Sequence, residues 1–537
     1  MTLNGVLGSS TVSYNQGSTG AATITQQAKN QQVVSVLDFG ADPTGATSND
    51  IAMANSLSTA SVVVVPANGT SYAGSAVTVP STKVLRGENN NGAAVSASIT
   101  LSSNSRIEKL NLINTSSPIS PLIAATSNVK LDGLTIATAG YAVNLTNNTY
   151  PGFGIDVSNC VINSTGYALL TGANGGNSPL GSGQVRMVNN TASTVNADAI
   201  EQNYPFGRPK GFVTMGNFLS QSGAASGTAG FGIGAAAVEQ AVYVGNVVTD
   251  ASAECFHLED SYKNVSIVAN SFYGRSHGVN VIPVMQTGET ALPATIMGNT
   301  AATSTTASGF GYYLFYTTPA TVSGHTLIGN VASNYLGGYH IGAGDIGNHA
   351  VNYLGGNVAD NCVSAMYGIG NVNGYWTVQR GENIAKNCQY LFSVNNGNCF
   401  FGKVTSTTTP SGIAAPFSYG AKMPSRIDGF SYPEQSTSTY AGLVNMLSFA
   451  AGGMFFGRFR YAGKSTGTNN WANYSATLKY DGTTLTVTDV VSRCSGGLIT
   501  NVTVVLSAGR IFVQATCSGG FVMNGQWVDF DGEYWDA

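Results

Sequence analysis

Val242-Tyr243-Val244-Gly245-Asn246 and Thr295-Ile296-Met297-Gly298-Asn299 are two copies of one pattern, in which alternating apolar residues precede a glycine and an asparagine. The asparagine recurs at intervals of 24 to 31 residues, as Asn190, Asn217, Asn246, Asn270, Asn299, Asn330, Asn357 and Asn383. Such a period predicts a solenoid in which each turn contributes one rung and stacks on the next. We expect each asparagine to take a left-handed turn conformation and to bond to the asparagine of the next rung.

The composition narrows the class of protein. Charged residues are only 9% of the chain, against about 25% in typical soluble domains, and the net charge is -4. This balance offers no basic surface to nucleic acid. No apolar run approaches the roughly 18 residues that span a bilayer, so we expect no membrane insertion. The first ten residues also lack the pattern of a secretory signal.

The seven cysteines contain no Cys-x-x-Cys pair, so we predict no metal site and no cofactor. Cys362 and Cys388 occupy equivalent places in two repeats. Because free cysteine is commonly buried as a small hydrophobic residue, these two are expected to stack as reduced core residues.

The repeats are preceded by Val33-Val34-Ser35-Val36-Leu37-Asp38-Phe39-Gly40-Ala41-Asp42-Pro43-Thr44-Gly45 and then by a predicted helix around residues 49–57. This entry segment resembles that of pectate-lyase-like right-handed β-helix proteins. The lead-in before it, from Ser13 to Ala21, resembles that of bacteriophage tailspikes and tail-fibre depolymerases in the same superfamily. A helix at this point would cover the open edge of the first rung.

The resemblance implies a homotrimer on the phage tail that acts at the bacterial cell surface. Its partners would be phage tail or baseplate proteins and a bacterial capsular polysaccharide or O-antigen. The expected fold class is all-β: a right-handed parallel β-helix with a C-terminal antiparallel β-sandwich. We expect a lead-in or remnant of a virion-attachment domain at residues 1–32, the β-helix at 33–405, and the sandwich, for trimerisation or carbohydrate binding, at 406–537.

Each rung is predicted to contain a further strand after its asparagine. Alternation directs Ile200, Phe256 and Leu258 inward and places Glu201, His257 and Glu259 on the outer face. Titratable residues gather in this part of an otherwise nearly neutral chain, namely Asp198, Glu201, Arg208, Lys210, Glu254, His257, Glu259, Asp260, Arg275, His277 and Glu289. Such a cluster is a candidate site.

The spacing favours glycoside hydrolysis. Glu201 and His257 are at the same offset from their asparagines, two rungs apart, which is about 9–10 Å at the usual strand spacing. An inverting glycosidase separates its carboxylates by roughly 6.5–9.5 Å. We therefore expect Glu201 to face Glu259, or else Glu254 or Asp260, with His257 tuning their pKa values or holding the sugar. The predicted substrate-binding residues are Asp198, Tyr204, Tyr262, Tyr273, Arg275 and His277.

Two alternatives stay open. A polysaccharide lyase would use His257 or Tyr262 as base and Arg275 or Lys210 to neutralise a uronic acid. A receptor-binding spike without catalysis would use the β-helix as a rigid adhesin. Asn196-Ala197-Asp198 and Ser276-His277-Gly278 faintly resemble two polygalacturonase motifs, but the paired aspartates and the Arg-Ile-Lys of that branch are absent, so pectin specificity does not carry over.

Overall fold

Alternating apolar and polar residues produce parallel strands whose side chains point inward and outward in turn. In the computed structural model the repeats are in register, so that Val213 pairs with Val242 and Thr295 with Thr326. The structure describes residues 13–14, 24–25, 28–29, 32–68, 70–89, 92–114, 123–125, 127–146, 153–172, 184–194, 196–204, 210–220, 230–282, 293–303, 309–316, 325–343, 350–369, 375–378, 383–395, 398–399, 404–406, 426–432, 435–437, 444–448, 454–465, 471–481, 483–495, 499–507, 510–517 and 521–535.

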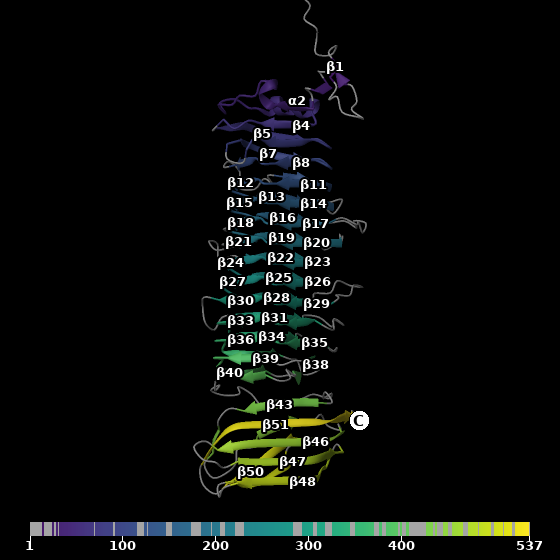
Figure 1. Ribbon diagram of the computed structural model, residues 1–537, viewed down its shortest axis with the longest axis vertical. Coiled ribbons are helices and arrows are strands. Elements are labelled where there is room, and N and C mark those ends of the chain that lie inside the picture. The colour runs from purple at the N-terminus through teal and green to yellow at the C-terminus, as the bar shows by residue number, and fades with distance from the viewer. Residues whose placement is uncertain are drawn as a thin grey trace, which may run out of the picture. The chain divides into compact units, whose positions relative to one another are not determined.

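The chain divides into two compact units, residues 1–252 and 253–537. In the first unit, three parallel sheets share the rungs (Figure 1). The first sheet contains β3 (Val33–Ser35), β4 (Val62–Val65), β6 (Val84–Gly87), β8 (Arg106–Glu108), β11 (Ser127–Asp132), β14 (Phe153–Ser158), β17 (Val185–Val188), β20 (Lys210–Met215) and β23 (Glu239–Val244). The second contains β5 (Ser71–Val79), β7 (Ala94–Leu101), β9 (Asn111–Asn114), β10 (Ile123–Ala125), β12 (Thr135–Thr138), β15 (Val161–Ser164), β18 (Thr191–Thr194), β21 (Phe218–Ser220) and β24 (Val247–Ala251). The third contains β13 (Val143–Thr146), β16 (Leu169–Gly172), β19 (Ile200–Asn203) and β22 (Ile233–Ala236).

The second unit also has three parallel sheets. Its first sheet contains β26 (Lys263–Val268), β29 (Ala294–Met297), β32 (Thr326–Ile328), β35 (Ala350–Gly355), β38 (Tyr375–Val378) and β41 (Asn398–Cys399). The second contains β27 (Ser271–Gly274), β30 (Thr300–Thr303), β33 (Val331–Ser333), β36 (Val358–Asp360), β39 (Asn383–Lys386) and β42 (Val404–Ser406). The third contains β25 (Phe256–Glu259), β28 (Val279–Ile282), β31 (Phe310–Tyr316), β34 (Gly337–Ala343), β37 (Ser364–Ile369) and β40 (Tyr390–Asn395).

The strands after β42 are antiparallel and form two sheets. The larger one contains β43 (Arg426–Tyr432), β44 (Gln435–Thr437), β46 (Met454–Ser465), β47 (Trp471–Tyr480), β48 (Leu485–Ser495) and β51 (Phe521–Trp535). The smaller one contains β45 (Val444–Ser448), β49 (Ile499–Ser507) and β50 (Arg510–Cys517). The predicted fold class is therefore confirmed, both in its parallel β-helix and in its C-terminal antiparallel sheets. The exact domain boundaries stay a prediction.

The entry segment begins the β-helix as expected. Strand β3 ends at Ser35, whose side chain caps a 3-10 helix, η1 (Val36–Phe39). Helix α2 (Asp50–Thr59) follows where a helix was predicted, and it buries Met53 and Leu57. None of the described helices is long and apolar enough to cross a membrane. Of the lead-in, the described residues include β1 (Ser13–Tyr14), paired with β2 (Ile24–Thr25); the rest of the predicted attachment remnant lies outside them.

The recurring asparagines form a buried ladder in each unit. Asn299 donates from Nδ2 to Oδ1 of Asn330 at 3.0 Å, and its own Oδ1 accepts from Nδ2 of Asn270 at 2.8 Å. The predicted bonding is thus confirmed, but the predicted conformation is wrong. Among the described residues, the left-handed one is that before the asparagine, for example Gly298 with φ +65°. Glycine carries no Cβ to oppose this conformation, which leaves the asparagine side chain free to point into the core.

The core also holds stacked pairs of larger side chains. Tyr312 and Tyr339 stack with ring centroids 5.1 Å apart, and both are buried. Cys362 and Cys388 are free and buried, and each lies two residues after a member of the in-register pair Asp360 and Lys386, which confirms the predicted stacking of reduced cysteines.

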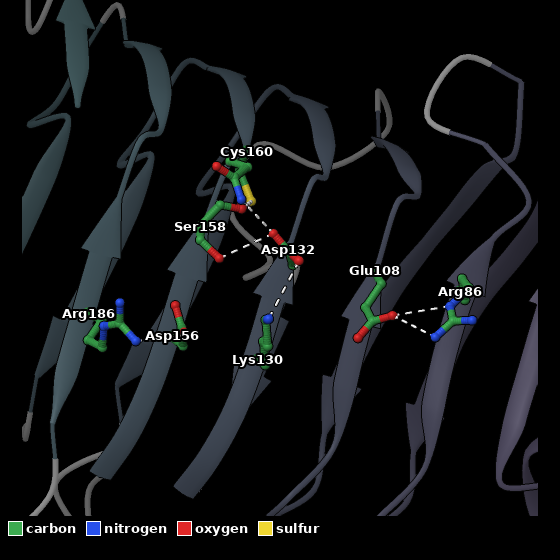
Figure 2. A network of polar contacts seen from close by, with 9 residues as sticks. Arg86, Glu108, Lys130, Asp132, Asp156, Ser158, Cys160 and Arg186 are labelled. Carbon is green, nitrogen blue, oxygen red and sulfur yellow. Dashed lines mark hydrogen bonds and ion pairs between the residues drawn. The ribbon is translucent and has the colours of Figure 1, made fainter. Parts of the chain in front are cut away.

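Most of the charged side chains on the first sheet of the first unit are paired across rungs (Figure 2). Arg86 bonds to Glu108 of the next rung at 2.9 Å and Arg186 lies 3.7 Å from Asp156, whereas Lys130 lies 3.5 Å from Asp132 of its own strand. These groups are partly exposed, so each pair contributes less than about 1 kcal/mol. The pairs neutralise the surface and match the register, and they explain these charges without a catalytic role.

Candidate active site on the third sheet

The outer face of the third sheet in the second unit carries a column of polar and aromatic side chains. His257 of β25 pairs in register with Asn280 of β28, which pairs with Tyr313 of β31, which pairs with His340 of β34. Their strand neighbours Phe256, Val279, Tyr312 and Tyr339 are buried in the core. Because side chains alternate along a strand, the whole column projects outward.

His257 lies between two carboxylates. Its Nε2 is 3.2 Å from Oε2 of Glu259, which is a hydrogen bond, and its Nδ1 is 3.6 Å from Oε2 of Glu254, which is within ion-pair distance only. The amide of Asn280 donates to the other oxygen of Glu254 at 2.9 Å. The Glu254 side chain is 14% exposed and that of Glu259 is 39% exposed. Glu254 is thus held from two sides, whereas Glu259 faces solvent.

The pKa values follow from this arrangement. Burial alone would lower the pKa of His257, but hydrogen bonds and charge from Glu254 and Glu259 outweigh it and raise the pKa to about 9. Burial would likewise raise the pKa of Glu254, but its contacts with His257 and Asn280 lower it. At neutral pH the group is an imidazolium between two acidic side chains.

Aromatic rings surround the last two members of the column, Tyr313 and His340. His277 stacks on Phe310 with ring centroids 5.4 Å apart, and Tyr313 stacks on His340 at 4.5 Å. The ring centroid of Phe310 lies 5.1 Å from that of Tyr313 and 4.0 Å from that of His340. We call His277, Phe310, Tyr313 and His340 the aromatic platform. Nδ1 of His277 accepts from the backbone N–H of Phe310, so the neutral ring carries its proton on Nε2.

In the first unit, Glu201 lies on the outer face of β19 and pairs in register with Gly234 of β22. A methyl group at Gly234 would collide with Oε2 of Glu201, so the glycine leaves room for the carboxylate. Asp198 is nearly buried, and its Oδ1 accepts the backbone N–H of Phe231 at 2.5 Å. Burial and then the charges of these two acids raise the pKa of Tyr167 to about 12.

Several predicted binding residues are not available to a sugar at the surface. Tyr204 is buried and packs on Phe212 with ring centroids 5.2 Å apart. Tyr262 is buried and bonds to Nε2 of His325 at 3.0 Å. The prediction that these two tyrosines line the substrate site is therefore wrong, because apolar packing keeps them in the core.

The remaining predicted residues have different positions. Tyr273 is exposed but lies on β27 of the second sheet, not on the sheet of Glu259. Arg275 is exposed between β27 and β28, and Asp260 occupies a left-handed position (φ +62°) directly after β25. Nζ of Lys210 lies 3.1 Å from Oε1 of Glu239, so this lysine belongs to an ion pair. Arg208 and Glu289 lie outside the described residues.

Asn280, Phe310, Tyr313 and His340 were missed by sequence reasoning. Their column is in register in space, but His257, Asn280, Tyr313 and His340 follow their ladder asparagines by 11, 10, 14 and 10 residues. The turns between the ladder asparagine and the third sheet differ in length from rung to rung. Residues at the same distance in sequence from their asparagines are therefore not always paired on adjacent strands. Within the described residues no group of three His, Cys, Asp or Glu side chains is arranged to hold a metal ion.

No protein-family model and no curated protein matches the chain. Among solved structures, it is similar to a double mutant of the tailspike of E. coli bacteriophage HK620, at 12% identity over 98% of each chain with a TM-score of 0.49. The same tailspike in complex with a pentasaccharide gives 10% identity over 98% of each chain and a TM-score of 0.46. Tailspike protein 3 of bacteriophage CBA120 gives 14% identity over 79% of this chain and 70% of that one, with a TM-score of 0.45. These are all phage tailspike proteins, and likeness at this level says nothing about activity.

Proposed function

We propose that this chain is a tailspike depolymerase that binds and hydrolyses a polysaccharide of the bacterial surface. The proposal depends on one observation: the imidazolium of His257 lies between Glu254 and Glu259, beside aromatic rings on the outer face of a β-sheet. Glycosidic bonds are cleaved by paired carboxyl groups. The lead-in from Ser13 to Ala21, with its resemblance to tailspike depolymerases, supports the same class.

Glu259 is the best placed carboxylate of the second unit to reach a substrate, because it is the most exposed of the three groups. Glu254 is better suited to positioning, since Asn280 and His257 hold it and its lowered pKa keeps it ionised. We propose Glu201 of the first unit, on the spacing of the repeats alone, as a further catalytic carboxyl group. In glycoside hydrolysis one carboxyl group protonates the glycosidic oxygen and another activates water.

The lyase alternative is weaker on three counts. A raised pKa makes His257 a poor base at neutral pH. Tyr262 is buried away from the surface, and Lys210 already has an acidic partner in Glu239. Arg275 is exposed and leaves this chemistry open to the assay below.

The test is incubation of the purified protein with capsular polysaccharide or lipopolysaccharide, followed by chain length, reducing ends and absorbance of unsaturated products. We expect shortened chains with new reducing ends and no unsaturated product. Glu201→Gln and Glu259→Gln are each expected to lower kcat by at least about 100-fold. Glu239→Gln is a matched control, because Glu239 belongs to an ordinary surface pair.

Gly234→Ala is a second test of Glu201 that leaves the glutamate itself unchanged. The new methyl group must displace the Glu201 carboxylate, whereas φ at this position lies outside the left-handed range in which a side chain would be strained. We expect a large loss of kcat with a fold that is unchanged by circular dichroism. Full activity in both Gln variants would end the hydrolase proposal, and binding without cleavage by the wild type would favour a non-catalytic spike.

Assembly and location complete the proposal. We propose a homotrimer attached to phage tail or baseplate proteins, acting from the virion on capsule or O-antigen, as the resemblance of the lead-in to tailspikes implies. Sedimentation of the purified chain would test the trimer directly.

A further inference from the structure

The aromatic platform groups four aromatic rings on the outer face of the third sheet of the second unit. His277, Phe310 and Tyr313 are each half-buried, while His340 is almost fully buried beneath its neighbours. Core packing therefore does not account for the three outer rings, because part of each remains open to solvent. Partly exposed aromatic faces on a polar surface are typical of a binding site for a ligand with an apolar face.

The platform is uncharged at neutral pH. Burial lowers the pKa of His277, and burial together with its neighbour His277 lowers the pKa of His340 to about 3. The charged groups that act on His277 are Glu254 and His257. The adjacent acid–histidine–acid group has two carboxylates for one imidazolium, so it offers no surplus positive charge to an anionic ligand.

Asn280 links the two parts of the site. It lies between His257 and Tyr313 in the register of the sheet, and its Nδ2 donates to Glu254. Asn280 is 3% exposed, and none of the described residues donates to its Oδ1. A buried carbonyl oxygen without a donor costs about 1–3 kcal/mol, so an ordered water is the expected partner.

We propose that the aromatic platform stacks against an uncharged pyranose ring of the substrate beside Glu259, and so selects neutral sugars over uronic acids. The inference rests on the proposed function and assigns the substrate class of that same site. The apolar face of the ring lies on Phe310 and Tyr313. A uronic acid at this place would set its carboxylate against those of Glu254 and Glu259.

The experiment is saturation-transfer NMR on the full chain with methyl glycosides of glucose, galactose and N-acetylglucosamine, and with methyl glucuronide and galacturonide as charged counterparts. We expect transfer to at least one neutral glycoside and none to the uronides. Tyr313→Ala and Phe310→Ala should each raise the dissociation constant by about 3- to 10-fold. Tyr313→Phe should retain binding, which separates ring stacking from misfolding. Tyr273→Ala is the matched control, an exposed tyrosine on a different sheet.

Uronides that bind as well as the neutral glycosides, an unchanged dissociation constant in Tyr313→Ala, or no binding of any neutral glycoside would each overturn the inference. These outcomes are separate from failure of the proposed function. If neutral glycosides bind at the platform but polysaccharide is never shortened, the sugar subsite stands and the depolymerase does not. If polysaccharide is shortened with the same KM in Tyr313→Ala, the depolymerase stands and the subsite does not.

Discussion

His257 is a buried cation whose charge is set by two neighbours, and its titration is directly measurable. The chain has five histidines, and 13C labelling of their rings resolves each one. We expect His257 to titrate near 9, and His325 and His340, whose pKa values burial lowers, to titrate near 4 and 3. Glu254→Gln should move the pKa of His257 downward, because it removes one of the two acceptors. A His257 pKa at or below 6.5 in the wild type would contradict the acid–histidine–acid geometry.

The raised pKa of His257 also makes the stability of the fold depend on pH. A histidine whose pKa is higher in the folded than in the unfolded protein stabilises the fold below its unfolded pKa. For His257 this contribution is complete below about pH 6.5 and is lost as the pH rises through about 9. Glu254 acts in the opposite sense: its lowered pKa stabilises the fold above the usual carboxylate range and the effect is lost in acid. The site is therefore held together best at mildly acidic pH, above the usual carboxylate range and below about 6.5.

At the scale of single elements, the asparagine ladder is the strongest local device in the rungs. Asn299 is fully buried; its Nδ2 donates to Ile267 and Asn330, and its Oδ1 accepts from the N–H and Nδ2 of Asn270. Asn299→Ala leaves several of these groups without a partner. We expect a loss of about 3 kcal/mol in the free energy of unfolding, measured by denaturant titration. Thr300→Ala, at an exposed position in the same rung, should change it by less than about 0.5 kcal/mol. Equal effects of the two substitutions would contradict a structural role for the ladder.

The ladder also shows how much of the fold can be predicted from the sequence alone. Its period and the alternation around it were enough to predict the parallel rungs, the capping helix and the outward direction of Glu201, His257 and Glu259. The column from His257 to His340 was not predictable, because the turns between ladder and third sheet differ in length and only the folded register aligns them. The burial of Tyr204 and Tyr262 could not be predicted for a related reason. Acidic residues near a tyrosine in the sequence suggest a surface position, and only the folded structure shows its contacts in the core.

At the scale of the whole molecule, the low charge content predicts how stability responds to salt. Only 9% of the residues are charged, and the ion pairs of the first sheet, such as Arg86–Glu108, are partly exposed. Screening weakens exposed pairs but leaves buried hydrogen bonds and apolar packing almost unchanged. We expect the thermal midpoint, measured by circular dichroism at one scan rate, to differ by less than about 3 °C between 50 mM and 1 M KCl. Arg86→Met, which removes one pair, should likewise cost less than about 1 kcal/mol. A fall of 10 °C or more in high salt would mean that charge pairing, and not the asparagine ladder with its core, holds the rungs together.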